Sequence, residues 1–142
     1  MAGQKILVAY DGSGQSDKAL EWAIDLAKQM PAEILLVSVC NLPLHHFEEA
    51  PTYVERYNTT YRQNIATMLE KKKAGCTSPG LTINIRVREG HPVDEIIRCA
   101  QEEKADLIIV GNRGLGGFGQ LLLGSVAHKL VTYSPIPVIV IK

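Results

Sequence analysis

Five short stretches with strand-like patterns alternate along the chain with four stretches of helical periodicity, and this alternation restricts the possible folds more than any other feature of the sequence. The predicted strands span residues 6–10, 34–40, 81–88, 107–111 and 136–141, and the predicted helices begin near residues 14, 57, 92 and 122. Runs that are apolar on both faces are typical of parallel strands covered by helices on two sides. The 142 residues are therefore expected to form a single domain, over 1–142, of the α/β class.

The third predicted strand indicates the order of the sheet. Between residues 81 and 88 apolar and polar side chains alternate strictly, so one face of this strand must meet water. A flavodoxin-type order, 2-1-3-4-5, would bury it in the middle of the sheet. With the strand at an edge and right-handed crossovers, the sequence predicts an open five-stranded parallel sheet of order 3-2-1-4-5 with helices on both faces. Asp11, after the first strand, then shares one crevice with the segment that follows the fourth strand.

A glycine-rich segment, Gly111 to Ser125, links the fourth strand to the last helix. Glycines let the backbone approach a ligand closely, and the free N–H groups at a helix start favour anions. We therefore expect the N–H groups from Gly114 to Ser125 to bind phosphate, with the Ser125 hydroxyl as a further donor. Arg113 either neutralises phosphate charge or points into solvent. A flexible surface loop is the alternative interpretation of the segment.

Two common glycine motifs overlap this segment without fitting it. A dinucleotide-binding spacing begins at Gly114, but it follows the fourth strand, and the next strand ends in Lys142 instead of an acidic residue. A Walker A spacing begins at Gly119, but Ser125 stands where the phosphate-binding lysine is required. Neither a nucleotide-binding Rossmann unit of that kind nor an ordinary P-loop is predicted.

A third pattern, Gly111-x2-Gly114-x9-Gly124-Ser125, resembles the ATP-binding signature of the universal stress protein family. Residues 5–13 and 134–141 are similar to that family as well, so the resemblance covers essentially the whole chain. It implies a Rossmann-like fold of the adenine nucleotide alpha hydrolase-like type. It also implies that the chain binds ATP, or ADP or AMP, together with Mg.

The predicted nucleotide site combines the glycine-rich segment with the ends of the first two strands. It comprises Asp11, Val39, Gly111, Arg113, Gly114, Gly116, Gly117, Gly124, Ser125 and Val126. Asp11 would accept hydrogen bonds from the ribose hydroxyls or hold Mg, and its alternative role is a simple helix cap. By resemblance, Val39 would lie at the adenine, partly through its backbone.

The last strand raises a separate question, because it ends the sheet and is nevertheless apolar from Ile136 to Ile141. A bare apolar edge favours pairing with another chain. We therefore predict a homodimer in which this strand meets its copy across a two-fold axis, as the family resemblance also implies. Pro137 has no N–H, so its nitrogen must stay unpaired in that contact.

Composition excludes several other classes of function. Lys+Arg and Asp+Glu number 15 each, and the one basic cluster, Lys71–Lys73, falls at a helix end where we expect it to be solvated, so no nucleic acid is predicted as a partner. No apolar run is long enough to span a membrane and no signal peptide is recognisable, so a cytoplasmic protein is expected. Cys40, Cys76 and Cys99 lack metal or redox spacing and are predicted to be reduced. The adjacent His45 and His46 have no partner ligand, so no metal site is predicted from protein ligands alone.

No catalytic acid–base pair or activated nucleophile can be assembled from the sequence, which favours binding over catalysis. The leading hypothesis is a small ATP-binding stress-response or signalling module with an unknown protein partner. The alternatives are a slow ATPase or phosphoryl-transfer enzyme and a nucleotide-free dimeric scaffold. An adenylate-forming or pyrophosphatase-type enzyme is weakly supported, because residues 12–17 only vaguely match its loop. Residues 45–58 are the expected place for partner specificity.

Overall fold

The computed structural model describes residues 3–41, 51–76, 78–112 and 124–142, except for the side chains of 51–55 and 57. Strands and helices alternate in the order β1 (Gln4–Ala9), α1 (Gly14–Gln29), β2 (Ala32–Cys40), α2 (Pro51–Gly75), β3 (Ile83–Glu89), α3 (Pro92–Glu102), β4 (Leu107–Gly111), α4 (Ser125–Tyr133) and β5 (Val138–Ile141). All strand pairs are parallel, and the order is β3-β2-β1-β4-β5. The predicted fold class and strand order are confirmed.

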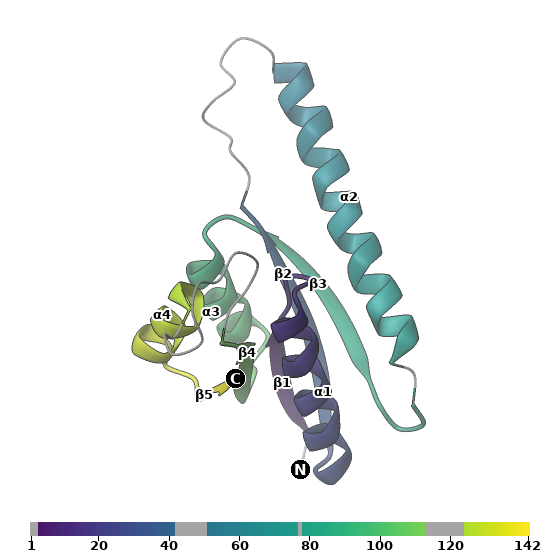
Figure 1. Ribbon diagram of the computed structural model, residues 1–142, viewed down its shortest axis with the longest axis vertical. Helices are drawn as coiled ribbons and strands as arrows, with labels where there is room; N and C mark the ends of the chain where they lie inside the picture. Colours follow the sequence, from purple (N-terminus) through teal and green to yellow (C-terminus); the bar gives the residue numbers. More distant parts are fainter. Residues whose placement is uncertain (1–2, 42–50, 77, 113–123) are drawn as a thin grey trace.

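The sheet lies between two layers of helices, with α1 and α2 on one face and α3 and α4 on the other (Figure 1). Successive side chains of a strand point to opposite faces. In β1, Ile6 and Val8 accordingly pack toward α1 and α2, whereas Leu7 packs toward α3 and α4. All three are fully buried, which stabilises the fold by about 1.5–3 kcal/mol for each side chain.

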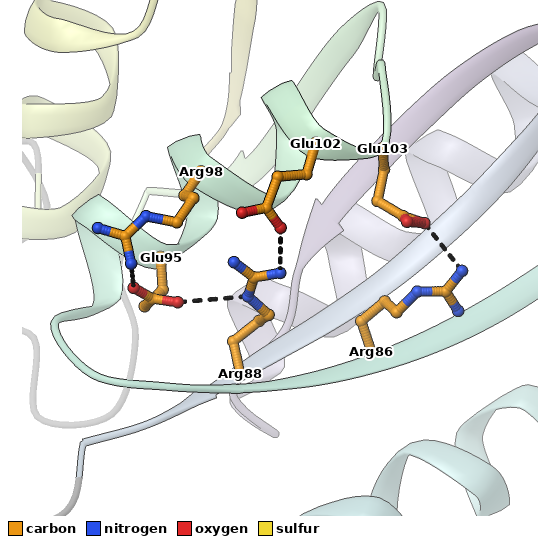
Figure 2. A network of polar contacts seen from close by, with 6 residues as sticks. All are labelled: Arg86, Arg88, Glu95, Arg98, Glu102 and Glu103. Atoms are coloured by element: carbon orange, nitrogen blue, oxygen red, sulfur yellow. Dashed lines mark hydrogen bonds and ion pairs between the residues drawn. The ribbon is translucent and has the colours of Figure 1, made fainter.

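The polar face of the edge strand β3 is covered by ion pairs with α3 (Figure 2). Arg88 lies 3.3 Å from Glu95 and 2.7 Å from Glu102, and Arg86 lies 2.8 Å from Glu103. The opposite, apolar face of the strand packs toward α2. The edge position of this strand was predicted correctly, but its polar side chains meet carboxylates of a helix and do not simply meet water.

Helix α2 is joined to α1 by a polar cluster that the sequence analysis did not anticipate. The hydroxyl of the buried Tyr10 donates to Asp17 at 2.6 Å, and the Lys72 ammonium lies 2.7 Å from the same carboxylate. These two donors, Lys72 first, hold the pKa of Asp17 below its usual range. The prediction of a fully solvated basic cluster is therefore wrong for Lys72.

Strand β5 begins two residues later than predicted, at Val138. The Ser134 hydroxyl donates to the carbonyl of Ile136 at 2.7 Å and accepts its N–H at 3.0 Å. Both backbone groups of Ile136 are thus engaged in a local turn before the ladder starts with the bond from Ile108 N–H to the carbonyl of Pro137.

Two further predictions concern the cysteines and the membrane. Cys40, Cys76 and Cys99 are free thiols, as predicted. Within the described residues, no helix, including the 25-residue α2, is long and apolar enough to cross a bilayer.

Candidate functional site

A pocket of about 630 Å³ opens at the carboxyl ends of the central strands. It lies where the strand order reverses between β1 and β4, the position at which open α/β sheets bind ligands. Its volume is in the range of small-molecule sites. The described residues that line it come from β1, β2, β4 and all four helices: Ala9, Tyr10, Asp11, Ser16, Val37, Ser38, Val39, Asn41, Tyr61, Ile65, Met68, Pro92, Ile96, Val110, Gly111, Asn112, Gly124, Ser125, Val126 and Ala127.

The structure brings together around this pocket every predicted site residue that it describes, namely Asp11, Val39, Gly111, Gly124, Ser125 and Val126. Arg113, Gly114, Gly116 and Gly117 lie outside the described residues. The crevice expected between the first and fourth strands therefore exists, with Asp11 on one of its sides and the start of α4 on another.

The N-terminus of α4 presents backbone donors to the pocket. The first hydrogen bond of this helix runs from His128 N–H to the carbonyl of Gly124, at 2.8 Å. The N–H groups of Ser125, Val126 and Ala127 consequently have no acceptor within the helix, and these three residues line the pocket. The positive end of the helix dipole adds to them, so this end of the pocket favours an anion.

Asn112 fixes the position of that helix start. Its N–H donates to the carbonyl of Ile141 at 2.7 Å, and its own carbonyl accepts the N–H of Gly124 at 2.8 Å. The Gly124 N–H is thereby occupied, so it is not one of the free donors that the sequence analysis expected. The Asn112 side chain is buried, and its Oδ1 has no hydrogen-bond partner among the residues that the structure describes. Asn112 was not among the predicted site residues, because an asparagine beside a glycine carries no specific signal by itself.

Asp11 stands in the turn between β1 and α1. One of its carboxylate oxygens accepts the N–H of Ser13 at 2.9 Å, a turn that Asp side chains commonly form. The helix cap is Ser13, whose hydroxyl accepts the N–H of Ser16 at 3.2 Å. The alternative interpretation of Asp11 as a simple helix cap is therefore wrong. Asp11 is exposed, and of the described residues around the pocket it alone carries a formal charge.

Two glycines near the pocket have a structural reason, which is close packing at Gly111 and a positive φ at Gly12. A Cβ placed on Gly111 would lie 2.8 Å from the backbone C and O of Gln15, so β4 and the first turn of α1 approach too closely for any side chain. Gly12 has a φ of +85°, and a Cβ there would lie 3.0 Å from the sulfur of Met68. The sequence analysis explained Gly111 by ligand approach alone, whereas the fold provides a reason that needs no ligand.

The end of the pocket at β2 is mainly apolar. Val39 and Asn41 lie at the end of this strand, and the Ser38 hydroxyl donates to the carbonyl of Tyr10. Tyr61, Ile65 and Met68 of α2 line the pocket together, because their i, i+4, i+7 spacing puts them on one helical face. A helix beginning near residue 57 was predicted, but helical spacing alone does not show that this face adjoins a pocket.

The described residues around the pocket form neither an assembled catalytic group nor a metal cage. Within the part of the chain that the structure describes, no group of three or more His, Cys, Asp or Glu side chains could hold a metal ion. The chemical character of the described pocket is an anion-favouring helix end, one carboxylate and an apolar slot.

The model of the universal stress protein family matches residues 3–142 of the chain. The chain belongs to the universal stress protein family. Among curated members, the universal stress protein YxiE of Bacillus subtilis is 32% identical over 152 residues, which cover 97% of this chain and 98% of the relative.

Solved structures of the universal stress protein family have the same fold. The universal stress protein UspA from Lactobacillus plantarum superposes with a TM-score of 0.83 at 22% identity, covering 100% of this chain and 99% of its own. A universal stress protein in complex with cAMP gives a TM-score of 0.66 at 28% identity, with 99% and 98% of the two chains covered. The chain thus shares its overall fold with both of these structures.

Proposed function

We propose that this protein is a nucleotide-binding module that holds an adenine nucleotide, in the first place ATP, in the pocket between β1 and β4. The observation that carries the proposal is the convergence of Asp11 and the free N–H groups of α4 on one pocket at the reversal of strand order. A related protein, 28% identical, was solved in complex with cAMP, which supports an adenine nucleotide as the ligand class.

The phosphates would lie at the N-terminus of α4. The N–H groups of Ser125, Val126 and Ala127 and the Ser125 hydroxyl are the described donors, and hydrogen bonds to a charged phosphate contribute about 1.5–3 kcal/mol each. Gly124 would contribute the space left by its missing side chain. Arg113, Gly114, Gly116 and Gly117 complete this end in the proposal.

The remaining parts of the nucleotide follow the strand order. Asp11, at the end of β1, would accept hydrogen bonds from the ribose hydroxyls or share Mg with the phosphates. The base would reach Val39, at the end of β2. Since Asp11 is the one charged residue among the described pocket residues, Mg and the helix dipole are the expected means of offsetting phosphate charge there.

We prefer a binding and signalling role in the cytoplasm, in which a protein partner recognises the nucleotide-bound protein, over catalysis. Hydrolysis of ATP needs a group that orients the attacking water and a cation that stabilises developing charge. Among the described pocket residues, Asp11 is the only candidate for the first, and the second would have to come from Mg or from Arg113, which lies outside the described residues. A slow ATPase is the second candidate function. It would release phosphate from ATP in the presence of Mg, and Asp11→Ala would abolish this release.

The deciding experiment uses the purified protein. Any nucleotide released on denaturation is identified, and ATP with Mg is then titrated while unfolding is followed. Ligand at a hundred times its Kd should stabilise the fold by about 2.7 kcal/mol. Gly124→Val should remove this stabilisation by filling the phosphate space.

The matched control is Gly75→Val, at the end of α2, where a Cβ meets nothing within 4 Å. It should keep the full response to ATP. Unchanged ATP affinity in Gly124→Val would contradict the placement of the phosphates. Absence of both released nucleotide and stabilisation in the wild-type protein would favour the scaffold instead.

We further propose that the protein forms a homodimer through the segment Ile136 to Ile141. Strand β5 is the last of the sheet, and 39% of Ile139 is exposed on it. Val131 and Tyr133 of the neighbouring α4 are also exposed large apolar residues. Sedimentation velocity at micromolar concentration should give a dimer that Ile139→Asp converts to a monomer, and a monomeric wild-type protein would refute this contact.

A further inference from the structure

The pocket extends well beyond the phosphate end. Strands β4 and β2 each pair with β1, so their carboxyl ends lie two strand spacings, about 9–10 Å, apart. A nucleotide whose phosphates lie at α4, after β4, therefore directs its base toward the end of β2. Two polar residues line the pocket near that strand end: Ser38, whose hydroxyl already donates to the carbonyl of Tyr10, and the exposed Asn41, which carries a carboxamide.

The walls around this strand end form a slot suited to a flat base. Tyr61 and Ile65 contribute one wall from α2, and Pro92 and Ile96 contribute another from α3. These helices cover opposite faces of the sheet, so the slot lies over the edge of the sheet between them. Apolar walls exclude water, and a hydrogen bond made inside them is stronger than one made in bulk solvent.

The position of Asn41 is held from both neighbouring elements. The preceding residue, Cys40, accepts the N–H of Gly90 at 2.9 Å, so β2 remains tied to β3 up to the last residue before Asn41. Next to the slot residue Tyr61, Arg62 forms an ion pair with Glu89 at the end of β3, which fixes α2 beside the same edge. Asn41 therefore directly follows a strand end that is hydrogen-bonded to β3 and lies beside α2, and such an anchored neighbourhood favours selective recognition of a ligand edge.

We infer that Asn41 recognises the amino-bearing edge of the adenine base in the slot between α2 and α3. A carboxamide matches this edge because its oxygen accepts from the 6-amino group while its NH₂ donates to the adjacent ring nitrogen. Asn41 is thus a specificity-determining residue that distinguishes a 6-amino purine from one without that group. This inference rests on the proposed nucleotide function and adds the chemistry by which the base is selected.

The test is a comparison of two ligands that differ in one group. Isothermal titration with Mg measures the Kd of ATP and of purine riboside 5′-triphosphate, which lacks only the 6-amino group. The wild-type protein should bind ATP about tenfold more tightly, the expected effect of about one to two net hydrogen bonds. In Asn41→Ala this ratio should fall to about one, with ATP weakened and the purine ligand changed less.

Two other variants make the result specific. Leucine has a volume similar to that of asparagine but no polar side-chain atoms. Asn41→Leu should therefore also bring the Kd ratio of the two ligands to about one, which shows that the ratio depends on hydrogen bonds and not on the volume of the side chain. Ser125→Ala, at the phosphate end, should weaken both ligands equally and keep the ratio. Circular dichroism of each variant verifies the fold.

The outcomes separate this inference from the proposed function. A wild-type ratio retained in Asn41→Ala and Asn41→Leu, with ATP binding lost in Gly124→Val, would overturn base recognition by Asn41 and leave the nucleotide site standing. A wild-type protein that binds neither ligand would overturn both. A ratio lost in both Asn41 variants and kept in Ser125→Ala supports the inference.

Discussion

Replacing Gly111 with alanine should destabilise the protein without any nucleotide present. The new Cβ would lie 2.8 Å from the backbone C and O of Gln15 and 2.9 Å from its Cβ, whereas unstrained carbon contacts are about 3.5–4.0 Å. Either β4 or the first turn of α1 must then move by roughly 0.7–1.2 Å, the difference between these two separations. Neither moves freely, because Gly111 pairs with Ile141 in the sheet and the Ser13 cap fixes the start of the helix.

Overpacking of this kind costs about 1–3 kcal/mol. With an m-value of about 2 kcal/mol/M, a loss of about 2 kcal/mol lowers the urea midpoint by about 1 M. The same loss lowers the melting temperature by about 4–8 °C in a chain of this length. Equilibrium urea unfolding of nucleotide-free protein, followed by circular dichroism, measures the change.

Gly14→Ala is the matched control. Gly14 is the first residue of α1, close in sequence to Gln15, and a Cβ there meets nothing within 4 Å. This variant should be neutral or slightly stabilised, because alanine lowers the entropy of the unfolded chain. An unchanged urea midpoint in nucleotide-free Gly111→Ala would refute the packing argument. If this variant weakened ATP binding without lowering stability, the glycine would be needed only for the ligand.

Three further outcomes are expected. Burial, and then the hydrogen bond to Asp17, raises the pKa of Tyr10 in the folded protein, so the stability that this shift contributes is fully present below the ordinary pKa of 10.0 and is lost as the pH rises above it. Above pH 10, the urea midpoint of Tyr10→Phe should therefore fall less steeply with pH than the wild-type midpoint. Equal slopes for the two proteins would contradict this. Glu95→Gln should lower the free energy of unfolding in urea by about 1–3 kcal/mol, because the buried Glu95 carboxylate accepts hydrogen bonds from two arginines. Glu102 is exposed and bonds one arginine, so Glu102→Gln should leave the urea midpoint unchanged. Equal effects of the two substitutions would refute the role of burial. Ser125→Ala should raise the Kd for ATP about tenfold or more by removing one charge-assisted hydrogen bond, and an unchanged Kd in calorimetry would exclude that hydroxyl from the phosphate site.

Much of the fold was predictable because it depends on local pattern. Continuous apolar runs identified the inner strands, and the alternation in β3 identified an edge strand, which fixed the order of the sheet together with the handedness of crossovers. The glycine spacing and Asp11 located the crevice for the same reason: the carboxyl ends of neighbouring parallel strands meet at one edge.

The remaining features depend on contacts between segments that are distant in the chain. An alternating strand shows that one face is polar, but it does not show that Arg86 and Arg88 meet carboxylates of α3. Helical periodicity likewise predicts an inward face for α2, yet it cannot distinguish a face buried in the core from one, like that of Tyr61, that lines a pocket.

The sequence by itself determined which segments form strands and helices, in what order the strands assemble and where the crevice between the first and fourth strands lies. Only the tertiary structure decided what each face meets: Gln15 against Gly111, the carbonyl of Asn112 on the N–H of Gly124, and Asn41 at the end of the slot. The physical reason is that periodicity and propensity are properties of a segment, whereas close approach is a property of two segments that the chain brings together only when it folds.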